Sequence, residues 1–252
     1  KHNYLKLSLF FTIIYVYNFY KKDGTMVKII SKQEACDLIK DGSVVMFGGF
    51  LAWGSAWEIT DLLADQNKVK NLTLVGNDTA FADKSYGRLM TNRQVSKVIV
   101  SHIGTNTETQ KQNTNKEIEV ELVPQGTLAE RIRAAGAGLG GILTPTGIGT
   151  LVEEGKQIIE VKGKKYILEE PLYGDIALVY ADKADKYGNL FHHGVTRNWN
   201  MIMPMACKTV IAEVKEISDE PLDPDNITVP CVFVDYVVKS DYDYLAKGLK
   251  KG

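Results

Sequence analysis

The sequence predicts an α/β protein, a three-layer α/β/α fold around an open and mostly parallel sheet. Two observations support this fold class. Apolar runs of strand length alternate with helical patterns from residue 26 onward. The apolar run 44–47 also ends in the glycine-rich loop Gly48-Gly49-Phe50 and leads into a further helical pattern. A hydrophobic content of 44% is enough for a sizeable core in such a fold.

The first half of this domain is expected to alternate regularly between helices and strands. Ser31 is the expected N-cap of the first helix, and Thr127-Leu128-Ala129-Glu130 fits a capping box. Alternation of this kind favours parallel strands with helices on both faces of the sheet. The expected helices span 32–39, 56–64, 86–90 and 127–135, and the expected strands span 44–47, 71–76, 97–101 and 118–123.

The second half has a less regular pattern. A glycine- and threonine-rich stretch, 136–149, predicts a long loop, which in a compact domain usually has a function. A hairpin is expected over 157–168, with its turn at Lys162-Gly163-Lys164. Residues 201–206 favour a short apolar helix. Further core strands are expected at 175–181, 209–214 and 229–238.

The amino-terminal residues differ from the rest of the chain. Residues 5–20 are strongly apolar, but they are fewer than the roughly 18–20 residues that a membrane-spanning helix needs. They lack the small-residue cleavage site of a signal peptide. We therefore interpret 1–25 as a non-native extension that is not part of the domain, with Met26 as the natural start. One domain is expected over 26–240, followed by a tail at 241–252.

Composition excludes several classes of function. The chain has 30 Lys and Arg against 31 Asp and Glu, so no global field attracts nucleic acid or an anionic membrane. Three cysteines lie far apart and show no metal-ligand spacing. These features predict a cytoplasmic protein without a bound metal, and without nucleic-acid or membrane partners.

The candidate ligand site lies where several strands end. Glycines allow close approach to a ligand, and the free N–H groups of the following helix favour a carboxylate. Asn77-Asp78 and Gln125-Gly126 each follow another strand, at the edge where open α/β sheets bind ligands. Their amide side chains can hold a carboxylate or a thioester carbonyl without adding charge. Turn formation alone also favours these residue types.

Other motifs are weaker indications. Residues 136–141 match G-x-G-x-x-G, but they follow a helix rather than a strand, which argues against dinucleotide binding. The adjacent His192 and His193 point in different directions on a strand, so a structural or surface role is expected. His102 could face the site, although a hydrogen-bonding role is more common. Residues 197–200 fit a capped helix start and a binding loop equally well.

Taken together, these motifs resemble the alpha (A) subunit of the family I CoA-transferases, of the acetoacetate, butyrate and acetate type. The resemblance covers nearly all of 26–239. It rests on ordered segments at 41–50 with Gly54, 76–78, 119–133, 138–149, 181–190, 197–200 and 211–214.

The resemblance implies the open α/β/α sheet that this family shares with sugar-phosphate isomerases. It also implies a complex of alpha and beta (B) subunits, commonly α2β2, that moves CoA from a short-chain acyl-CoA to a free carboxylic acid. The implied mechanism is ping-pong through a glutamyl-CoA thioester, with coenzyme A as substrate and no cofactor. The resemblance implies that the nucleophilic glutamate lies in the beta chain, in a Ser-Glu-Asn-Gly-like loop, and the present chain has no such sequence. Its nearest candidates, Glu153, Glu154, Glu169 and Glu170, have surface-like neighbours. The present chain would then supply substrate-binding residues, namely Gly48, Gly49, Phe50, Asn77, Asp78, Gln125 and Gly126.

Some residues depart from the family pattern. Ala56 stands where the family usually has proline, and the bulky Trp53 and Trp57 flank the loop. The acid pair therefore stays open among acetate, butyrate, acetoacetate and succinate, although no extra Arg or Lys is obvious in the site loops. A succinyl-CoA-dependent 3-oxoacid CoA-transferase, a sugar-phosphate isomerase and a non-catalytic relative are the alternatives. The isomerase would need a phosphate clamp, yet no Lys or Arg lies between Asp41 and Lys68.

Overall fold

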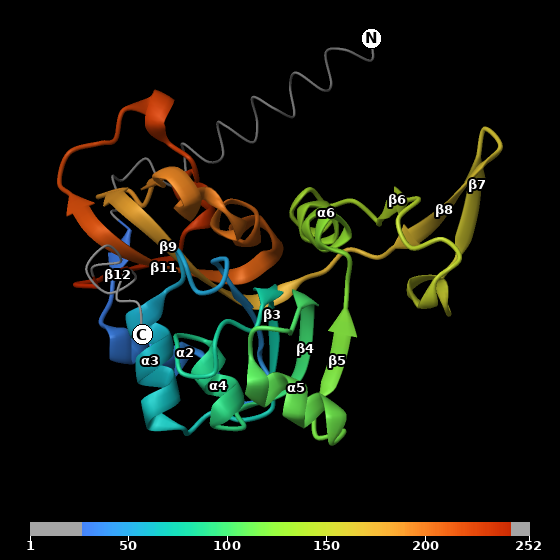
Figure 1. The fold of residues 1–252 in the computed structure, drawn as a ribbon. Coiled ribbons are helices and arrows are strands. Elements are labelled where there is room, and N and C mark those ends of the chain that lie inside the picture. The colour runs from blue at the N-terminus through green and yellow to red at the C-terminus, as the bar shows by residue number, and fades with distance from the viewer. Residues whose placement is uncertain (1–26, 243–252) are drawn as a thin grey trace, which may run out of the picture.

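The computed structural model describes residues 27–242, and it confirms the α/β class. Among these residues, the main sheet has nine strands (Figure 1). They are β1 (Lys28–Ile29), β2 (Val44–Phe47), β3 (Leu72–Asp78), β4 (Val95–His102), β5 (Glu119–Leu122), β9 (Gly174–Asp185), β10 (Leu190–Phe191), β11 (Cys207–Ser218) and β12 (Tyr236–Lys239). Their order is β1-β12-β11-β9-β2-β3-β4-β5, with β10 beside β9. All pairings along this order are parallel, whereas β10 is antiparallel to β9.

Side chains of the central strands alternate between two separate cores. Val45 and Phe47 pack in the first core, whereas Met46 between them packs in the second. Val98 and Ile99 of β4 divide in the same way. Because successive strand residues point to opposite faces, both faces of the sheet must be covered by other elements. The three-layer architecture follows from this pattern.

Different kinds of helix cover the two faces. The first core is closed by α2 (Lys32–Leu38), α3 (Trp57–Gln66) and α4 (Gly87–Thr91), with α5 (Thr107–Thr114) beside α4. The second core is closed by α6 (Gln125–Gly136) and by the 3-10 turns η3 (Trp199–Met201) and η4 (Met203–Ala206), whereas η2 (Gly194–Arg197) before them has no buried residue. The expected Ser31 cap is confirmed as a full capping box with Glu34.

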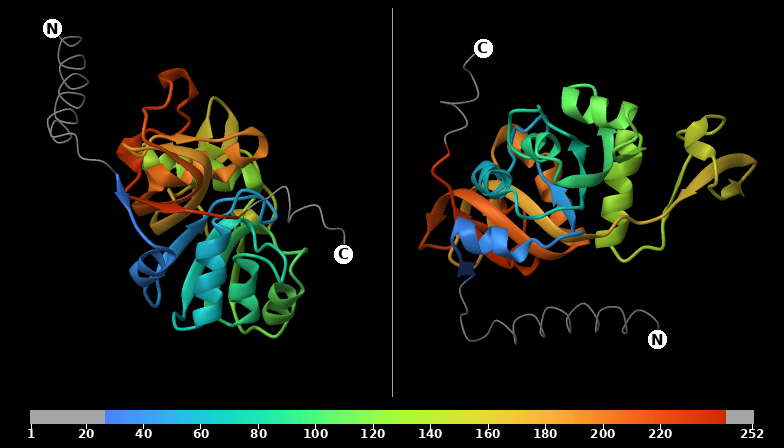
Figure 2. Two further views of the ribbon diagram at one scale, coloured as in Figure 1. Left: turned by 90° about the vertical axis from the view of Figure 1, so that its left-hand side faces the viewer. Right: turned by 90° about the horizontal axis from the view of Figure 1, so that it is seen from below.

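A second, smaller sheet projects from the body of the molecule (Figures 1 and 2). It consists of β6 (Ile142–Thr144), β7 (Ile158–Val161) and β8 (Lys164–Glu169), in the antiparallel order β6-β8-β7, and η1 (Leu151–Glu153) precedes β7. The hairpin prediction is confirmed, because Lys162 and Gly163 both have positive φ in a two-residue turn. The predicted loop 136–149 is partly wrong, since it contains β6.

The predicted capping box at Thr127 is wrong. Helix α6 begins earlier, at Gln125, with Pro124 as the N-cap and no side-chain cap. Proline presets a backbone angle that suits a helix start. Thr127 therefore lies within the first turn, and its buried hydroxyl has no hydrogen-bond partner among the described residues.

Two further predictions are corrected near the carboxyl end. The predicted strand 229–238 forms only from 236 onward, as part of β12 (Tyr236–Lys239), and Cys231–Phe233 is a 3-10 turn after Pro230. The predicted helix over 201–206 consists of 3-10 turns, because Pro204 lacks the N–H that an α-helix would use. The expected extension 1–25 lies outside the described residues, as does all of the tail 241–252 except its first two residues.

Within the described residues, no helix combines the length and the apolar composition needed to cross a membrane.

Candidate functional site

The predicted meeting of strand ends is confirmed. Strands β2, β3, β4 and β5 are neighbours in the sheet and run parallel, so their carboxyl ends share one edge. The glycine loop follows β2, Asn77 and Asp78 end β3, and Gln125 begins α6 after β5. This edge is where open α/β sheets bind ligands.

A row of hydrogen bonds links these strand ends. Gln125 Nε2 donates to Asn77 Oδ1 at 2.5 Å, and Asn77 Nδ2 donates to Asp78 Oδ2 at 2.7 Å. The same carboxylate oxygen accepts the backbone N–H of Leu51 at 2.9 Å. Ser101 Oγ, from β4, donates to the Asn77 carbonyl at 2.7 Å. Residues from four strand ends therefore form one connected polar unit.

Asp78 is fully engaged within this unit. Its side chain is buried, and its other oxygen, Oδ1, accepts the Ala80 N–H at 2.7 Å and the Tyr86 hydroxyl at 3.0 Å. Burial, followed by the nearby carboxylate, raises the pKa of Tyr86 well above its usual value, so its proton stays on the hydroxyl. Asp78 thus fixes the glycine loop to β3, while its predicted role in substrate binding stays a prediction.

The glycine loop is folded as a tight turn that presents two aromatic side chains. Phe50 and Trp53 form an antiparallel bridge, and Leu51 and Ala52 between them have φ of 50° and 70°. Two consecutive positive φ values identify a type I′ turn, which is strained for residues other than glycine, asparagine and aspartate. Phe50 is 45% exposed and Trp53 is 37% exposed, so neither aromatic ring is taken up by the core.

The segment that follows β10 supports the loop. Asn200 is fully buried; its Oδ1 accepts the Tyr180 N–H at 3.0 Å, and its Nδ2 donates to the Gly54 carbonyl at 2.7 Å. A Cβ on Gly48 would lie 1.8 Å from Asn200 Oδ1, so only glycine fits there. Asn198 Oδ1 accepts the Gly49 N–H at 3.1 Å. The capped start predicted at 197–200 is present as a 3-10 turn, because the Asn198 side chain accepts the Asn200 N–H at 3.4 Å. A role of this segment in ligand binding stays a prediction.

The four backbone N–H groups from Gly48 to Leu51 all bond acceptors within the chain. The N–H of Gly48 donates to the Leu178 carbonyl at 2.9 Å, and that of Phe50 donates to the Trp53 carbonyl at 3.0 Å. Those of Gly49 and Leu51 bond Asn198 and Asp78 as described above. Satisfied donors fix the shape of the loop, and two of the four bonds involve side chains rather than backbone.

The start of α3 already holds a carboxyl group from within the chain. Glu213 of β11 accepts the N–H of Ile59 at 2.9 Å and that of Glu58 at 3.3 Å, and it also accepts the Ser240 hydroxyl at 2.8 Å. Burial raises the pKa of this carboxyl to about 7. The helix N-terminus is therefore not open to a ligand. Sequence reasoning missed this role, although a lone glutamate in an apolar strand was a visible signal.

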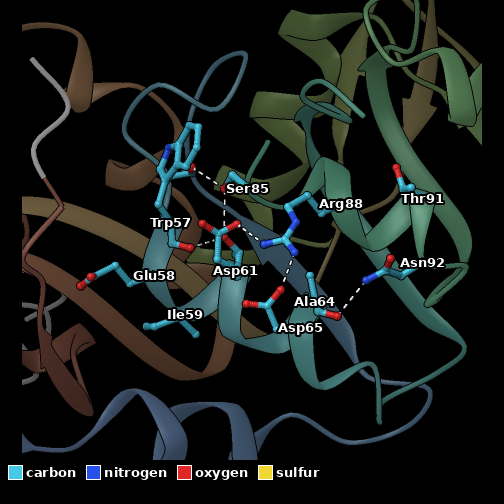
Figure 3. Close-up of polar contacts among 12 residues, drawn as sticks. Trp57, Glu58, Ile59, Asp61, Ala64, Asp65, Ser85, Arg88, Thr91 and Asn92 are labelled. Atoms are coloured by element: carbon cyan, nitrogen blue, oxygen red, sulfur yellow. Dashed lines mark hydrogen bonds and ion pairs between the residues drawn. The ribbon is translucent and has the colours of Figure 1, made fainter. Parts of the chain in front are cut away.

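Helix α3 is also fixed along its exposed face, as Figure 3 shows. Arg88 of α4 donates to Asp61 at 2.9 Å and to Asp65 at 2.5 Å, one turn apart on α3. The Asn92 side chain donates to the Ala64 carbonyl at 2.7 Å. The helix after the glycine loop is thus restrained at its start and along its length.

A cavity of about 700 Å³ lies beside the glycine loop. Apolar groups of Phe50, Trp53 and Val195 dominate its wall, together with Gly194 and Asn198. Arg197 also lines it, with its Nε donating to the His192 carbonyl at 3.0 Å. The sequence did not single out a cation at the site, but the structure brings Arg197 there from a segment about 150 residues away in the chain.

The remaining candidates are placed elsewhere. His192 is buried and neutral, because burial lowers its pKa to about 4, and its Nδ1 contacts the Thr228 hydroxyl at 2.7 Å; His193 is exposed. Glu169 is 2% exposed and pairs with Lys156 at 2.7 Å, so its expected surface setting is wrong. Within 27–242, no cluster of three or more His, Cys, Asp or Glu side chains fits a metal ion.

Comparisons with known proteins agree with this geometry. Residues 29–240 match the family model "Coenzyme A transferase". The chain is 47% identical over 213 residues to the alpha subunit of the acetoacetyl-CoA:acetate/butyrate CoA transferase of Clostridium acetobutylicum, covering 84% of this chain and 97% of that protein. It is 44% identical over 214 residues to the alpha subunit of the acetate CoA-transferase of Escherichia coli, with the same shares covered.

Solved structures show the same fold at lower identity. An acyl-CoA transferase from Escherichia coli O157:H7, in a thioester complex with CoA, superposes with a TM-score of 0.78 at 23% identity, over 91% of this chain. The present chain spans half the length of that protein's chain. Glutaconate coenzyme A-transferase from Acidaminococcus fermentans gives a TM-score of 0.76 at 21% identity, covering 87% of this chain and 77% of that one. From the family model and the curated relatives together, the chain belongs to the coenzyme A transferase family, as a member of its alpha-chain group.

Proposed function

We propose that this chain is the alpha subunit of a heteromeric enzyme that moves CoA from a short-chain acyl-CoA to a free carboxylic acid. Acetoacetyl-CoA, butyryl-CoA and acetyl-CoA are the proposed donors, in line with the names of the curated relatives. The observation that carries the proposal is the polar unit at the sheet edge, in which Gln125, Asn77 and Asp78 are linked to the glycine loop. An α2β2 assembly in the cytoplasm is part of this proposal.

The proposed chemistry is exchange of one thioester for another. A glutamate carboxylate of the partner chain attacks the acyl-CoA carbonyl, forming an acyl anhydride and releasing the CoA thiolate. The thiolate then attacks the glutamyl carbonyl of the anhydride, which forms the glutamyl-CoA thioester and releases the first acid. The second acid reverses both steps and leaves as the new acyl-CoA. One thioester is made for each thioester broken, so the reaction as proposed needs no cofactor besides the CoA substrate.

In this scheme the chain binds and orients the reacting groups. The Gln125 amide carries two N–H donors, and only one of them is needed for the bond to Asn77 Oδ1. Its second donor can bind an acyl or carboxylate oxygen, where a neutral donor stabilises developing charge. The Gly49 N–H bonds the side chain of Asn198, so a rotation of that amide would offer this donor to substrate as well.

The aromatic turn fits the need to exclude water. Both the anhydride and the glutamyl thioester hydrolyse if water reaches them. Phe50 and Trp53 form the apolar wall of the cavity next to the loop, together with Val195. The apolar side chains of this wall offer no hydrogen bonds to water, so they would disfavour water next to a short acyl chain bound against them.

One observation favours a second candidate, a succinyl-CoA-dependent 3-oxoacid CoA-transferase. Arg197 lines the same cavity as Phe50 and Trp53, and a guanidinium group can pair with the distal carboxylate of a dicarboxylic acid. A relative from Bacillus subtilis, 45% identical over 215 residues, is named as one chain of a probable succinyl-CoA:3-ketoacid coenzyme A transferase. Succinate must therefore be tested beside acetate and butyrate.

The experiment compares this chain alone with this chain co-purified with its beta partner. Loss of acetoacetyl-CoA is followed with acetate, butyrate or succinate as acceptor, and activity is expected only in the complex. Gln125→Ala should lower turnover by about 100- to 1,000-fold, the range for losing one well-placed oxyanion donor, while the complex still assembles. Gln33→Ala, on the exposed face of α2, is the matched control and should change nothing. Full activity from this chain alone, or no effect of Gln125→Ala, would contradict the proposal.

A further inference from the structure

The segment after β12, residues 240–242, folds back onto the start of α3, and we call it the clasp. The Ser240 hydroxyl donates to Glu213 Oε1 at 2.8 Å, and the Asp241 N–H donates to Glu58 Oε2 at 3.0 Å. Although the clasp is irregular, Ser240 is only 1% exposed. The clasp is therefore held by one carboxyl group on β11 and one on α3.

Tyr242 of the clasp stacks on Trp57, the first residue of α3. The two ring centroids lie 4.7 Å apart, and the rings are inclined by 22°. Tyr242 is 7% exposed, and its N–H donates to the Ser240 hydroxyl at 3.2 Å. Aromatic pairs at this separation attract each other beyond the effect of burial alone. The clasp thus fixes the tyrosine ring, and the tyrosine ring restrains the indole.

Trp57 extends this restraint to the glycine loop. Its Nε1 donates to the Ala52 carbonyl at 2.8 Å, inside the turn in which Leu51 and Ala52 both have positive φ. A strained turn keeps its shape only where surrounding contacts hold it. The Ser55 hydroxyl donates to the same carbonyl at 2.8 Å. Of these two side-chain donors, the indole is the one that stacks on the clasp.

The position of this turn matters for the cavity beside it. Phe50 and Trp53, which flank the strained pair, provide apolar wall to the cavity, whereas neither Trp57 nor Tyr242 lines it. A shift of the turn would move both aromatic rings relative to a bound acyl chain. Butyrate has two methylene groups more than acetate, and contact with each is worth about 4-fold in affinity.

We propose that Tyr242 and Trp57 are positioning residues for the apolar wall. The clasp holds the Trp57 indole against the Ala52 carbonyl, and this bond sets where Phe50 and Trp53 meet the acyl chain. The pair therefore contributes to selection of the acid by its length, from outside the cavity. This inference rests on the proposed CoA-transferase function and adds a determinant of its specificity.

The test uses three variants and a matched control. Trp57→Phe keeps a ring for Tyr242 to stack on but removes the N–H that Ala52 accepts; Tyr242→Ala removes the stacked ring, and Tyr242→Phe keeps it. Tyr236→Ala, on β12 and packed against the first core, is the control. Hydrogen exchange of the peptide 48–55 is measured by mass spectrometry in the whole chain. Transfer from acetoacetyl-CoA to acetate and to butyrate is measured in the complex with the beta partner.

Trp57→Phe and Tyr242→Ala are expected to speed exchange in 48–55 by about 3- to 10-fold, the effect of losing one hydrogen bond or one ring contact. The ratio of kcat/KM for butyrate to that for acetate should fall by about 4- to 15-fold, as one or both extra methylene groups lose contact with the wall. Tyr242→Phe should restore most of both properties. Tyr236→Ala should lower stability and leave the ratio unchanged.

Unchanged exchange in 48–55, or equal losses of activity with acetate and butyrate, would overturn the proposal, because a merely structural role would affect both acids alike. The same fall of the ratio in Tyr236→Ala would overturn it too. Trp57→Phe decides the question if Tyr242→Ala does not fold. If the wild-type complex transfers CoA to no acid, the proposed function is refuted, and the exchange data still decide whether the clasp positions the turn.

Discussion

Replacing Glu213 by glutamine should remove a defined part of the pH dependence of stability. The carboxyl has an ordinary pKa of 4.5 and one of about 7 in the folded chain, chiefly because it is buried. At 1.36 kcal/mol per pKa unit, this difference of about 2.5 units corresponds to about 3 kcal/mol. The folded chain holds this proton more tightly than the unfolded chain. The stability from this group is therefore complete below pH 4.5 and is lost as pH rises through 7.

The assay is chemical unfolding of the wild-type chain and the Glu213→Gln variant at intervals from pH 4.5 to 8.5. The variant loses a hydrogen bond at every pH, because a glutamine NH2 group cannot accept the N–H of Ile59 or Glu58. From pH 4.5 to pH 8.5, the free energy of unfolding of the variant should nevertheless rise by about 3 kcal/mol relative to that of the wild type. Glu216→Gln, exposed on the same strand and paired with Lys183, is the control and should show no such gain. Parallel pH profiles for wild type and Glu213→Gln would refute the reasoning.

Three further predictions concern the glycine loop. Gly48→Ala must displace the Asn200 amide from its buried hydrogen bonds and should cost about 3 kcal/mol of unfolding free energy. The control Gly140→Ala, whose Cβ would meet no atom within 4 Å, should cost less than about 1 kcal/mol. Equal costs for the two variants would contradict the role of Asn200. Asn198→Ala removes the acceptor of the Gly49 N–H, so we expect denaturant unfolding to show a loss of about 1–2 kcal/mol of unfolding free energy. We also expect a lower kcat/KM, and unchanged kinetics would argue against a role of this loop in turnover. Ala56→Pro should add about 0.4–1 kcal/mol by thermal unfolding, because φ at Ala56 is −77° and its N–H has no acceptor among the described residues; a loss of stability would show that the buried ring does not fit.

Much of the fold could be predicted because its signals are local. The run 44–47 is bounded by glycines, and the structure places β2 over these residues. The hairpin was predicted from Lys162-Gly163-Lys164, because a two-residue turn needs positive φ. Helix α5, by contrast, was not expected. Its sequence has no apolar stripe, and its position depends on the Asn106 cap and on Gln112 bonding the Met90 carbonyl.

The candidate site was predictable in outline but not in its inner contacts. That Asn77 and Gln125 would meet follows from parallel strands sharing an edge. Two inner contacts could not be predicted, because a local pattern does not specify long-range contacts. Asn200 fills the space beside Gly48, and Arg197 lines a cavity together with Phe50. The expected free N–H groups of α3 were wrong for the same reason, since their acceptor, Glu213, is more than 150 residues away.

The central claim is that this chain binds substrate and that a partner chain supplies the nucleophile. The most direct test is to incubate the complex with acetoacetyl-CoA, reduce the glutamyl thioester with borohydride, and locate the modified glutamate by peptide mass spectrometry. The account predicts a modified residue in the beta chain, while every glutamate of the present chain, including Glu153, Glu154, Glu169 and Glu170, is unchanged. A modified glutamate in the present chain would contradict the account.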